Sequence, residues 1–249
     1  VLVSKTGREP VTEAFRILRT NLNFISKDGI PPQVITLTSF SIGVGKTFTA
    51  INLSSILSFL DKKVVVLDLD LRKGTLSTRM GVNQAKGVSH YLSDAKVSVD
   101  DIIAKNNEGN ANLDFIPIGV IAPNPVELLL SKRLDTLIAD LRTRYDYIIV
   151  DGVPVGIVAD ASIVDRISDL TMFIIRVGKM DRRQLPEIEK IYETGKLSNL
   201  AIVLNGLKLG GSGYGYGSYG YGYGGYGYGY GYGKTEKKSF FDRFKSSKI

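Results

Sequence analysis

Five short apolar runs, rich in β-branched residues, recur along the chain and are separated by longer amphipathic stretches. The runs lie at 34–37, 64–67, 147–150, 172–175 and 201–204. Strands that are apolar throughout are buried on both faces, as in parallel sheets. The stretches with helical spacing of apolar residues lie at about 11–25, 46–60, 125–143, 159–167 and 184–195. This alternation predicts an α/β fold: a doubly wound, mostly parallel sheet flanked by helices.

The chain changes character at residue 210. Residues 210–233 consist of 13 glycines, nine tyrosines and two serines. Glycine gives the backbone freedom without a side chain to pack, so we expect a flexible tail here. The predicted organisation of the 249 residues is one domain at 1–209, the Gly/Tyr-rich tail at 210–233 and a basic C-terminal segment at 234–249.

Composition excludes several kinds of site. The chain has no cysteine and a single histidine, His90, so disulfides, cysteine-ligated metals and a multi-histidine zinc site are excluded. No apolar run approaches the roughly 18 residues of a membrane span, and we expect a soluble, cytoplasmic domain. Of the net charge of +7, residues 234–249 supply six basic and two acidic side chains, or +4. The remaining +3 gives no indication of a nucleic-acid partner.

The loop after the first predicted strand has the composition of a phosphate-binding loop. Residues 39–47 read SFSIGVGKT and precede a predicted helix. Glycines let the backbone amides turn toward phosphate oxygens, the lysine adds a positive charge and the threonine hydroxyl is a Mg²⁺ ligand. Phe40 stands where the P-loop pattern G-x-x-x-x-G-K-[ST] begins with glycine. The alternative is a turn that only caps the helix. The predicted nucleotide-binding residues here are Gly43, Val44, Gly45, Lys46, Thr47 and Phe48.

Acidic residues end two further predicted strands, at the sheet edge where α/β proteins bind ligands. Asp68, Asp70 and Arg72 end the second strand, and alternation along an extended backbone would point all three to one side. Asp151 closes a later strand in the manner of a Walker B aspartate, which helps to hold Mg²⁺. Taken alone, the end of the second strand would be interpreted as an ordinary solvated junction, and any strand can end in aspartate by chance. Beside a P-loop they predict a Mg²⁺-nucleotide site with Thr47, Asp70 and Asp151 as metal-binding residues.

As a set, these motifs resemble those of the bacterial tyrosine kinases, the autokinases of capsule and exopolysaccharide export. The resemblance rests on the P-loop, on D-x-D-x-R at 68–72 and on the Walker B with a nearby proline at 151–154. It extends to E-x-x-R-x-x-R at 13–19 and P-N-P-x-E-L-L at 123–129, and it covers about residues 1–209. The sequence departs from the family at Gly152 and Val153, where D-T-P-P is commoner, and at Gly74, where proline often follows R-K.

The resemblance implies an ATP- and Mg²⁺-dependent kinase that transfers phosphate to tyrosine. Asp68 is then the candidate base for the tyrosine hydroxyl and Asp70 assists the metal through water, but both are expected to point the same way and the division of roles stays open. Asn205, after the last strand, would read the adenine edge or cap the chain locally. The implied catalytic residues are Lys46, Asp68, Asp70, Arg72 and Asp151.

The tail supplies the expected substrate. Its tyrosines are spaced by two or three residues and separated almost wholly by glycine, so each could reach a γ-phosphate in extended form. Taken by itself, a Gly/Tyr repeat is more typical of an adhesive or nucleic-acid-stacking tract. This repeat contains no Arg or Lys for backbone contacts, and the kinase resemblance favours phosphorylation. The predicted phosphoacceptors are Tyr214, Tyr216, Tyr219, Tyr221, Tyr223, Tyr226, Tyr228, Tyr230 and Tyr232.

The resemblance also implies partners. Subunits would form a homo-oligomer, with a ring as the expected form, and Glu13, Arg16 and Arg19 would lie on one side of the contact. An ordinary exposed helix with i, i+3 ion pairs is the alternative for these three residues. A membrane activator segment, fused or separate, and an opposing tyrosine phosphatase complete the expected partners. The expected location is the cytoplasmic face of the bacterial inner membrane.

Two rival functions stay open. Partitioning and cell-division-site ATPases have a related loop with an additional lysine where this chain has Ser41, and such an ATPase would bind a membrane through its tail. The second rival is an inactive nucleotide-binding partner module with an adhesive tail. Without the additional lysine, the ATPase mechanism lacks its main cation, which favours the kinase.

Overall fold

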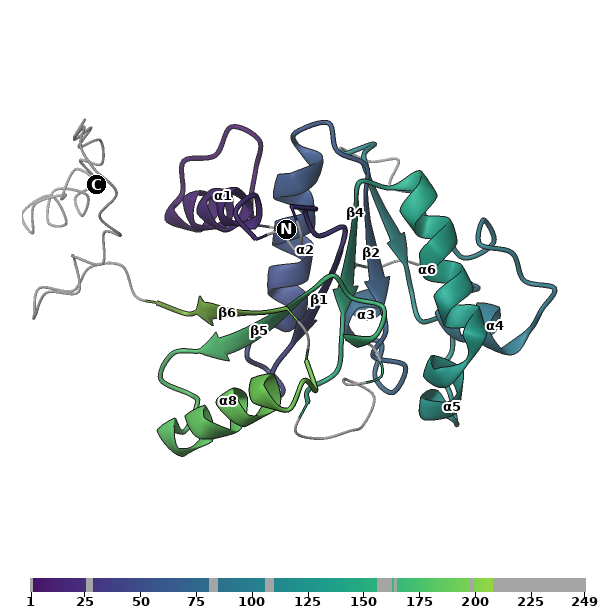
Figure 1. Ribbon diagram of the computed structural model, residues 1–249. Helices are drawn as coiled ribbons and strands as arrows, with labels where there is room; N and C mark the ends of the chain where they lie inside the picture. Colours follow the sequence, from purple (N-terminus) through teal and green to yellow (C-terminus); the bar gives the residue numbers. More distant parts are fainter. Residues whose placement is uncertain are drawn as a thin grey trace, which may run out of the picture. The chain divides into compact units, whose positions relative to one another are not determined.

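All neighbouring strands of the central sheet run parallel (Figure 1). The computed structural model describes residues 2–25, 29–80, 85–105, 110–155, 163, 165–197 and 199–207. The strand order is β3-β2-β4-β1-β5-β6, which confirms the predicted α/β class with a parallel sheet. The strands are β1 (Val34–Thr38), β2 (Val64–Asp68), β3 (Leu113–Ile116), β4 (Tyr147–Asp151), β5 (Leu170–Arg176) and β6 (Leu200–Asn205).

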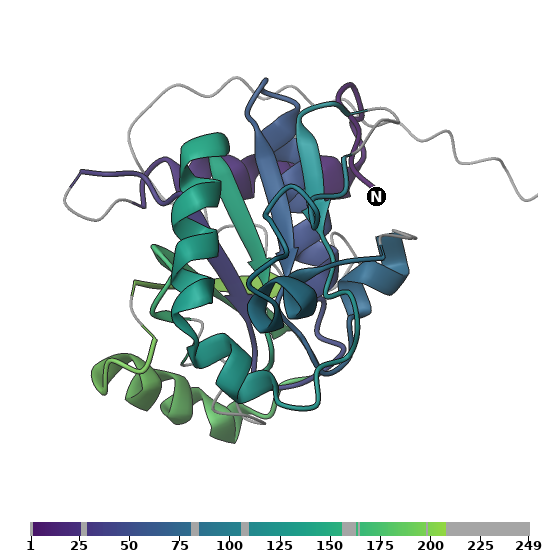
Figure 2. The same ribbon diagram turned by 90° about the vertical axis from the view of Figure 1, so that its right-hand side faces the viewer.

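Helices cover both faces of the sheet, as the doubly wound prediction requires. One face carries α1 (Pro10–Leu22) and α2 (Lys46–Ser58), and the other carries α4 (Val88–Ser93), α5 (Pro125–Leu130) and α6 (Lys132–Arg144). Figure 2 shows α6 in front of the sheet and α1 behind it. Helix α3 (Thr75–Met80) follows β2, whereas η1 (Arg182–Gln184) and α8 (Leu185–Glu193) follow β5. Among the described helices, none combines the length and hydropathy of a membrane-spanning segment.

Helix α2 is enclosed almost completely, although it is rich in serine. Eleven of its 13 residues are buried, because the sheet lies on one side of it and α1 packs on another. The hydroxyls of Ser54 and Ser55 donate to the carbonyls of Ala50 and Ile51, one turn back. A buried hydroxyl needs such a partner, and the helix backbone supplies it locally.

The sequence patterns did not predict strand β3. Its central Asp114 breaks the apolar run, yet the residue is only 6% exposed. The carboxylate accepts hydrogen bonds of 2.6 Å from Lys105 Nζ and 2.7 Å from the Tyr145 hydroxyl. Burial, followed by this bond, raises the pKa of Tyr145. Paired in this way, an acidic residue is tolerated inside a strand.

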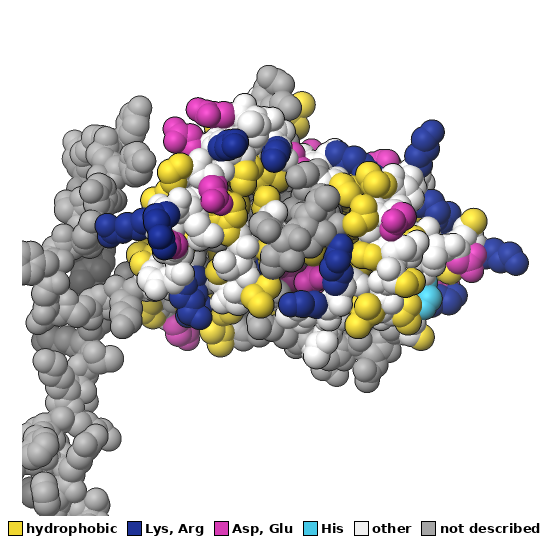
Figure 3. All heavy atoms as spheres, turned by 90° about the horizontal axis from the view of Figure 1, so that it is seen from below, with side chains coloured by type: hydrophobic (Ala, Val, Ile, Leu, Met, Phe, Trp, Pro, Cys, Tyr) yellow, Lys and Arg dark blue, Asp and Glu magenta, His cyan; other side chains and the backbone are white. Residues whose placement is uncertain are grey.

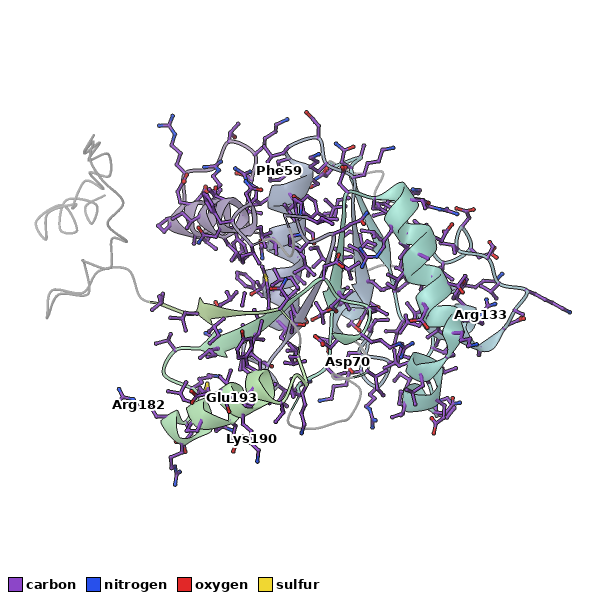
Figure 4. The ribbon with its side chains drawn as sticks, in the orientation of Figure 1. Phe59, Asp70, Arg133, Arg182, Lys190 and Glu193 are labelled. Carbon is purple, nitrogen blue, oxygen red and sulfur yellow. The ribbon has the colours of Figure 1, made fainter. Side chains whose placement is uncertain are left out.

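The helix predicted at 125–143 is two helices. Ser131 has an extended backbone between α5 and α6, and its hydroxyl donates to the carbonyl of Leu128. The break directs Arg133 of α6, labelled in Figure 4, onto the ring of Tyr91 at 4.2 Å. The Arg133 guanidinium also donates to carbonyls at the end of α4, so this side chain links α6 to α4.

Strand β6 forms one edge of the sheet and is less covered than the others. Ile202 and Leu204, on the face that α8 shares, are each 53% exposed. The described residues end at Leu207, so the predicted boundaries at 209 and 233 lie outside them. Most of the helix predicted at 159–167 also falls outside the described residues.

Candidate active site

Three central strands bring the predicted site residues to one end of the sheet. The P-loop follows β1, Asp68 ends β2 and Asp151 ends β4; the two aspartates are register partners on adjacent strands. Figure 4 shows Asp70 at this end, opposite to Phe59, which follows α2. Seen from that side in Figure 3, acidic and basic side chains lie next to each other in the middle of the surface. The carboxyl-end placement expected from the sequence is confirmed.

The P-loop has the backbone that its glycines predict. Gly43 and Gly45 have φ angles of 72° and 106°, in the left-handed region where a side chain is strained. Gly45 is also the N-cap of α2, and no side chain caps this helix. The first amides of α2 are therefore available to an anion, and the helix dipole favours negative charge there.

A cavity of about 110 Å³ lies against this loop. It brings together Lys46, Thr47, Asp70 and Asp151, all of which the sequence singled out. The Thr47 hydroxyl donates a 2.6 Å hydrogen bond to Oδ2 of Asp151. The cavity is lined by Ile42, Gly43, Gly45, Lys46, Thr47, Asp70, Lys73, Thr75, Asp151, Gly152 and Pro154.

Lys46 is the cation at the centre of this arrangement. Its Nζ lies 3.4 Å from the Ser39 hydroxyl. Burial lowers the pKa of Lys46, and the negative charges of Asp151 and Asp70 oppose that shift. A partly buried ammonium beside two carboxylates is a charge arrangement that a polyphosphate with its metal ion completes.

Asp68 and Asp70 occupy different surroundings, although the sequence treats them alike. Asp68 is fully buried, and its Oδ2 accepts from the Ser77 amide at 3.2 Å and the Ser77 hydroxyl at 3.0 Å. Burial and the nearby Asp151 raise the pKa of Asp68 to about 7. Asp68 does not line the cavity, whereas Asp70 does. The structure therefore separates the pair: Asp68 holds α3, and Asp70 faces the site.

Arg72 departs from the expected geometry. The predicted alternation requires an extended chain, but β2 ends at Asp68, and the amides of Lys73 and Gly74 both donate to the carbonyl of Asp70. This turn leaves Arg72 exposed and outside the cavity lining. The extended alternation expected for 68–72 does not continue past Asp68, and the catalytic role of Arg72 stays a prediction. The turn instead places Lys73 in the cavity wall, a residue that the sequence patterns missed.

Two departures from the family motifs have structural reasons. Gly74 has a φ of 57°, which the proline ring cannot adopt. Phe40, at the first P-loop position, packs edge-on against Phe173 with ring centroids 4.9 Å apart. Its side chain belongs to the apolar cluster that includes Ile188 of α8, so it anchors the loop away from the cavity and does not block it.

The remaining predicted binding residues lie around the loop. The ring of Phe48 packs against Phe15 of α1, with centroids 5.8 Å apart, and the Val44 side chain is buried in the same core. Neither lines the cavity. Asn205 donates from Nδ2 to the carbonyl of Val44 at 2.8 Å; its reading of adenine stays a prediction.

The oligomer residues lie on α1. Arg16 pairs with Glu13 within the helix, and Arg19 reaches the carbonyl of Ile56 in α2 at 3.4 Å. Beside them Ile17 is 62% exposed. These contacts match the i, i+3 alternative, and the subunit interface stays a prediction. The nine predicted phosphoacceptor tyrosines, Tyr214 to Tyr232, lie outside the described residues.

The donor set fits a magnesium ion that arrives with a nucleotide. No group of three or more His, Cys, Asp or Glu able to hold a metal occurs among the described residues. Magnesium, however, is usually bound by one or two carboxylates together with substrate phosphates and water. The cavity wall offers the carboxylates of Asp70 and Asp151 and the hydroxyl of Thr47, which is this type of incomplete set.

A larger cavity, of about 650 Å³, lies at the other end of the strands. Its wall includes Lys62, Arg142 and Arg144. Arg142 pairs with Asp169 at 2.7 Å, and Arg144 pairs with Asp100. Because its arginines are already neutralised and the sheet's carboxyl ends are remote from it, this cavity is a weaker candidate for phosphate chemistry.

Comparisons with known proteins agree with this site. A protein-family model described as an AAA domain matches residues 32–194. The tyrosine-protein kinase YwqD of Bacillus subtilis is 35% identical over 198 residues, which are 80% of this chain and 82% of YwqD. The tyrosine-protein kinase Wzc of Salmonella typhimurium is 33% identical over 81% of this chain, but the match spans only 28% of Wzc.

The solved kinase domain of the Escherichia coli tyrosine kinase ETK shares the fold. It superposes with a TM-score of 0.72 and 30% identity over 83% of this chain and 80% of that domain. The parallel sheet and loop are thus those of P-loop NTPases. Together with the cavity at the loop, these relatives show that the chain belongs to the family of bacterial tyrosine kinases.

Proposed function

We propose that this chain is an ATP- and Mg²⁺-dependent autokinase that phosphorylates the tyrosines of its own C-terminal tail and thereby regulates capsular or exopolysaccharide synthesis and export. The observation that carries the proposal is the single cavity shared by Lys46, Thr47, Asp70 and Asp151. Phosphoryl transfer depends on positioning and charge stabilisation, and these four side chains supply both.

Each part of the site has a role in this reaction. Lys46 and the loop amides bind the phosphates, and Thr47, Asp70 and Asp151 would hold Mg²⁺. The ion, when bound with ATP, neutralises charge on the transferring phosphoryl group. Lys73, in the same wall, adds a second positive charge near the phosphates.

The proton of the tyrosine hydroxyl needs an acceptor. Asp68 is the candidate implied by the family resemblance, and its pKa of about 7 suits a base that works near neutral pH. Asp70 is the carboxylate that lines the cavity. Asp68→Asn and Asp70→Asn separate them: loss of the base lowers turnover at saturating ATP and Mg²⁺, whereas loss of a metal ligand is partly restored by more Mg²⁺.

The tail is the proposed substrate because of its composition. It presents nine tyrosines among glycines, and a flexible 24-residue segment has an r.m.s. span of roughly 25–30 Å. That span allows a tyrosine to reach a neighbouring subunit, and we place Glu13, Arg16 and Arg19 in the contact between subunits. A membrane activator and an opposing phosphatase would switch the reaction on and reverse it.

Intact-mass measurement after incubation with Mg²⁺-ATP tests the proposal. The mass should rise in phosphate-sized steps that peptide mapping confines to 214–232. Lys46→Met should abolish the rise. Lys62→Met, at the opposite end of the sheet, is the matched control and should not.

Other outcomes contradict the proposal. ATP turnover without a gain in mass would identify an ATPase of the partitioning type. Neither turnover nor mass gain, with nucleotide still bound, would identify an inactive partner module.

Phosphorylation should also weaken the oligomer. Nine phosphotyrosines would add about −14 to −18 charges to a chain of net charge +7, so neighbouring tails would repel each other. Light scattering before and after ATP treatment should show a fall in mass of the assembly. An unchanged assembly would exclude this form of regulation.

A further inference from the structure

Asn205, the last residue of β6, contacts the nucleotide loop from outside the cavity. Its Nδ2 donates to the carbonyl of Val44 over 2.8 Å, but Asn205 is absent from the cavity wall, which includes Gly45. Asn205 therefore contacts the loop without itself lining the cavity. Such a position fits support of the loop better than contact with phosphate.

The sheet fixes Asn205 in place. Asn205 pairs with Arg176 in the register of β5 and β6. Its backbone carbonyl accepts a hydrogen bond of 2.9 Å from the Val177 amide. Strand pairing fixes the backbone from which this side chain starts, and the hydrogen bond to Val44 holds its amide end. The hydrogen bond to Val44 thus ties the position of the loop to that of the sheet.

This bond determines which way the next amide points. The peptide between Val44 and Gly45 is trans, and in a planar trans peptide the C=O and N–H groups point in opposite directions. A Val44 carbonyl held toward Asn205 therefore turns the N–H of Gly45 away from Asn205. Gly45 lines the cavity, so an amide turned away from Asn205 is available to a phosphate bound there.

The close fit gives a second reason for glycine at position 45. A Cβ built there would lie 2.2 Å from Nδ2 of Asn205, in addition to the strain of a φ of 106°. The loop residue and its support thus occupy adjoining space with no room for a side chain between them.

We propose that Asn205 is a positioning residue of the phosphate site: it holds the 44–45 peptide so that the Gly45 amide faces the nucleotide phosphates, independently of the base. The inference rests on the proposed nucleotide binding. It differs from the reading of adenine that the sequence implied, because a base reader distinguishes nucleotides from phosphate chains and a loop support does not.

Binding of two probes to the full chain tests this inference. Asn205→Leu keeps the shape of the side chain and removes its donor. By calorimetry with Mg²⁺, affinity for ADP and for inorganic triphosphate should fall by the same factor, about three- to tenfold for one neutral hydrogen bond. In the autokinase assay, KM for ATP should rise while kcat at saturation changes little.

The control uses the other end of the same strand. Asn199 donates from Nδ2 to the carbonyl of Asp169 at 2.7 Å and has a φ of 41°, so Asn199→Gly removes a comparable bond without backbone strain. This variant should bind both probes as the unsubstituted chain does. Thermal unfolding of both variants shows whether the fold is intact, and Asn205→Ser replaces the leucine variant if that one does not fold.

The outcomes are separable. Loss of ADP affinity alone would show that Asn205 reads the base, and unchanged affinity for both probes would show that it does not support the loop; either overturns the inference. An equal loss in Asn199→Gly would also overturn it. Failure of the unsubstituted chain to bind either probe would instead refute the proposed function.

Discussion

The hydroxyl of Thr47 and the carboxylate of Asp151 are joined by a hydrogen bond of 2.6 Å. The two side chains are 9% and 2% exposed, and they connect the start of α2 to the end of β4. Both are proposed metal ligands, and this hydrogen bond shows that the fold places them side by side. Folding, and not the arrival of the nucleotide, assembles this part of the site.

Replacement of Thr47 by valine should therefore affect stability and activity together. Thr47→Val removes a buried hydrogen bond to a charged group, which contributes about 1.5–3 kcal/mol. Loss of a hydroxyl ligand to Mg²⁺ should lower autokinase turnover at least about 100-fold. Thr47→Ser keeps the hydroxyl and should retain most of both; urea unfolding and the phosphorylation rate provide the measurements.

The free energy of unfolding of the nucleotide-free chain should depend on pH through Asp68. Its pKa is raised to about 7, whereas the pKa of an aspartate in an unfolded chain is about 3.9. Between these values the unfolded chain has lost a proton that the folded chain keeps, so this group makes the free energy of unfolding fall as pH rises from about 4 to 7.

Asp68→Asn should remove that contribution. Relative to the unsubstituted chain, the variant should gain about 1 kcal/mol per pH unit across the window, measured by urea unfolding at several pH values. Asp135→Asn, at a half-exposed ion pair with Arg166, is the control and should show no such trend. A difference between Asp68→Asn and the unsubstituted chain that does not vary with pH would contradict the assignment.

Two adjacent cations should differ in their effect on nucleotide affinity. Lys73 lines the cavity and Arg72 does not. Lys73→Gln should weaken ATP binding about tenfold, since a hydrogen bond to a charged phosphate is lost, and Arg72→Gln should weaken it much less. Binding of a fluorescent ATP analogue compares the two directly. Equal losses would show that the turn at 70–74 rearranges when nucleotide binds.

The unusual residue at the first P-loop position should contribute to stability. Phe40 is partly buried against Phe173, so Phe40→Ala should reduce the free energy of unfolding by about 1–3 kcal/mol. Phe24, which is 81% exposed, offers a matched control, and Phe24→Ala should change stability by less than about 0.5 kcal/mol. Similar effects of both substitutions would show that the aromatic contact is not stabilising.

Much of the sheet was predictable because its strands are buried on both faces. A continuous apolar run can be identified from the local sequence alone, and five of the six described strands contain such a run. Strand β3 did not, because Asp114 interrupts it and the groups that compensate the aspartate, Lys105 and Tyr145, come from other parts of the chain. No local pattern contains that information.

The site residues likewise divide into those that local motifs predict and those that depend on the folded chain. Lys46, Thr47 and Asp151 follow from local motifs attached to strand ends. The alternation expected for Arg72 holds only while the chain stays extended, and the turn after Asp68 ends it. The support of the loop by Asn205 joins residues 161 positions apart, a relationship that only the folded sheet reveals.

The enclosure of α2 limits how the enzyme can move. Since eleven of its 13 residues are buried, a shift of this helix would open packed layers on two sides at once, which dense interiors resist. We therefore expect any rearrangement on substrate binding at the exposed rim of the site, at Ile42 and Lys73, and not in this helix. Each round of phosphate transfer and product release should leave α2 undisplaced.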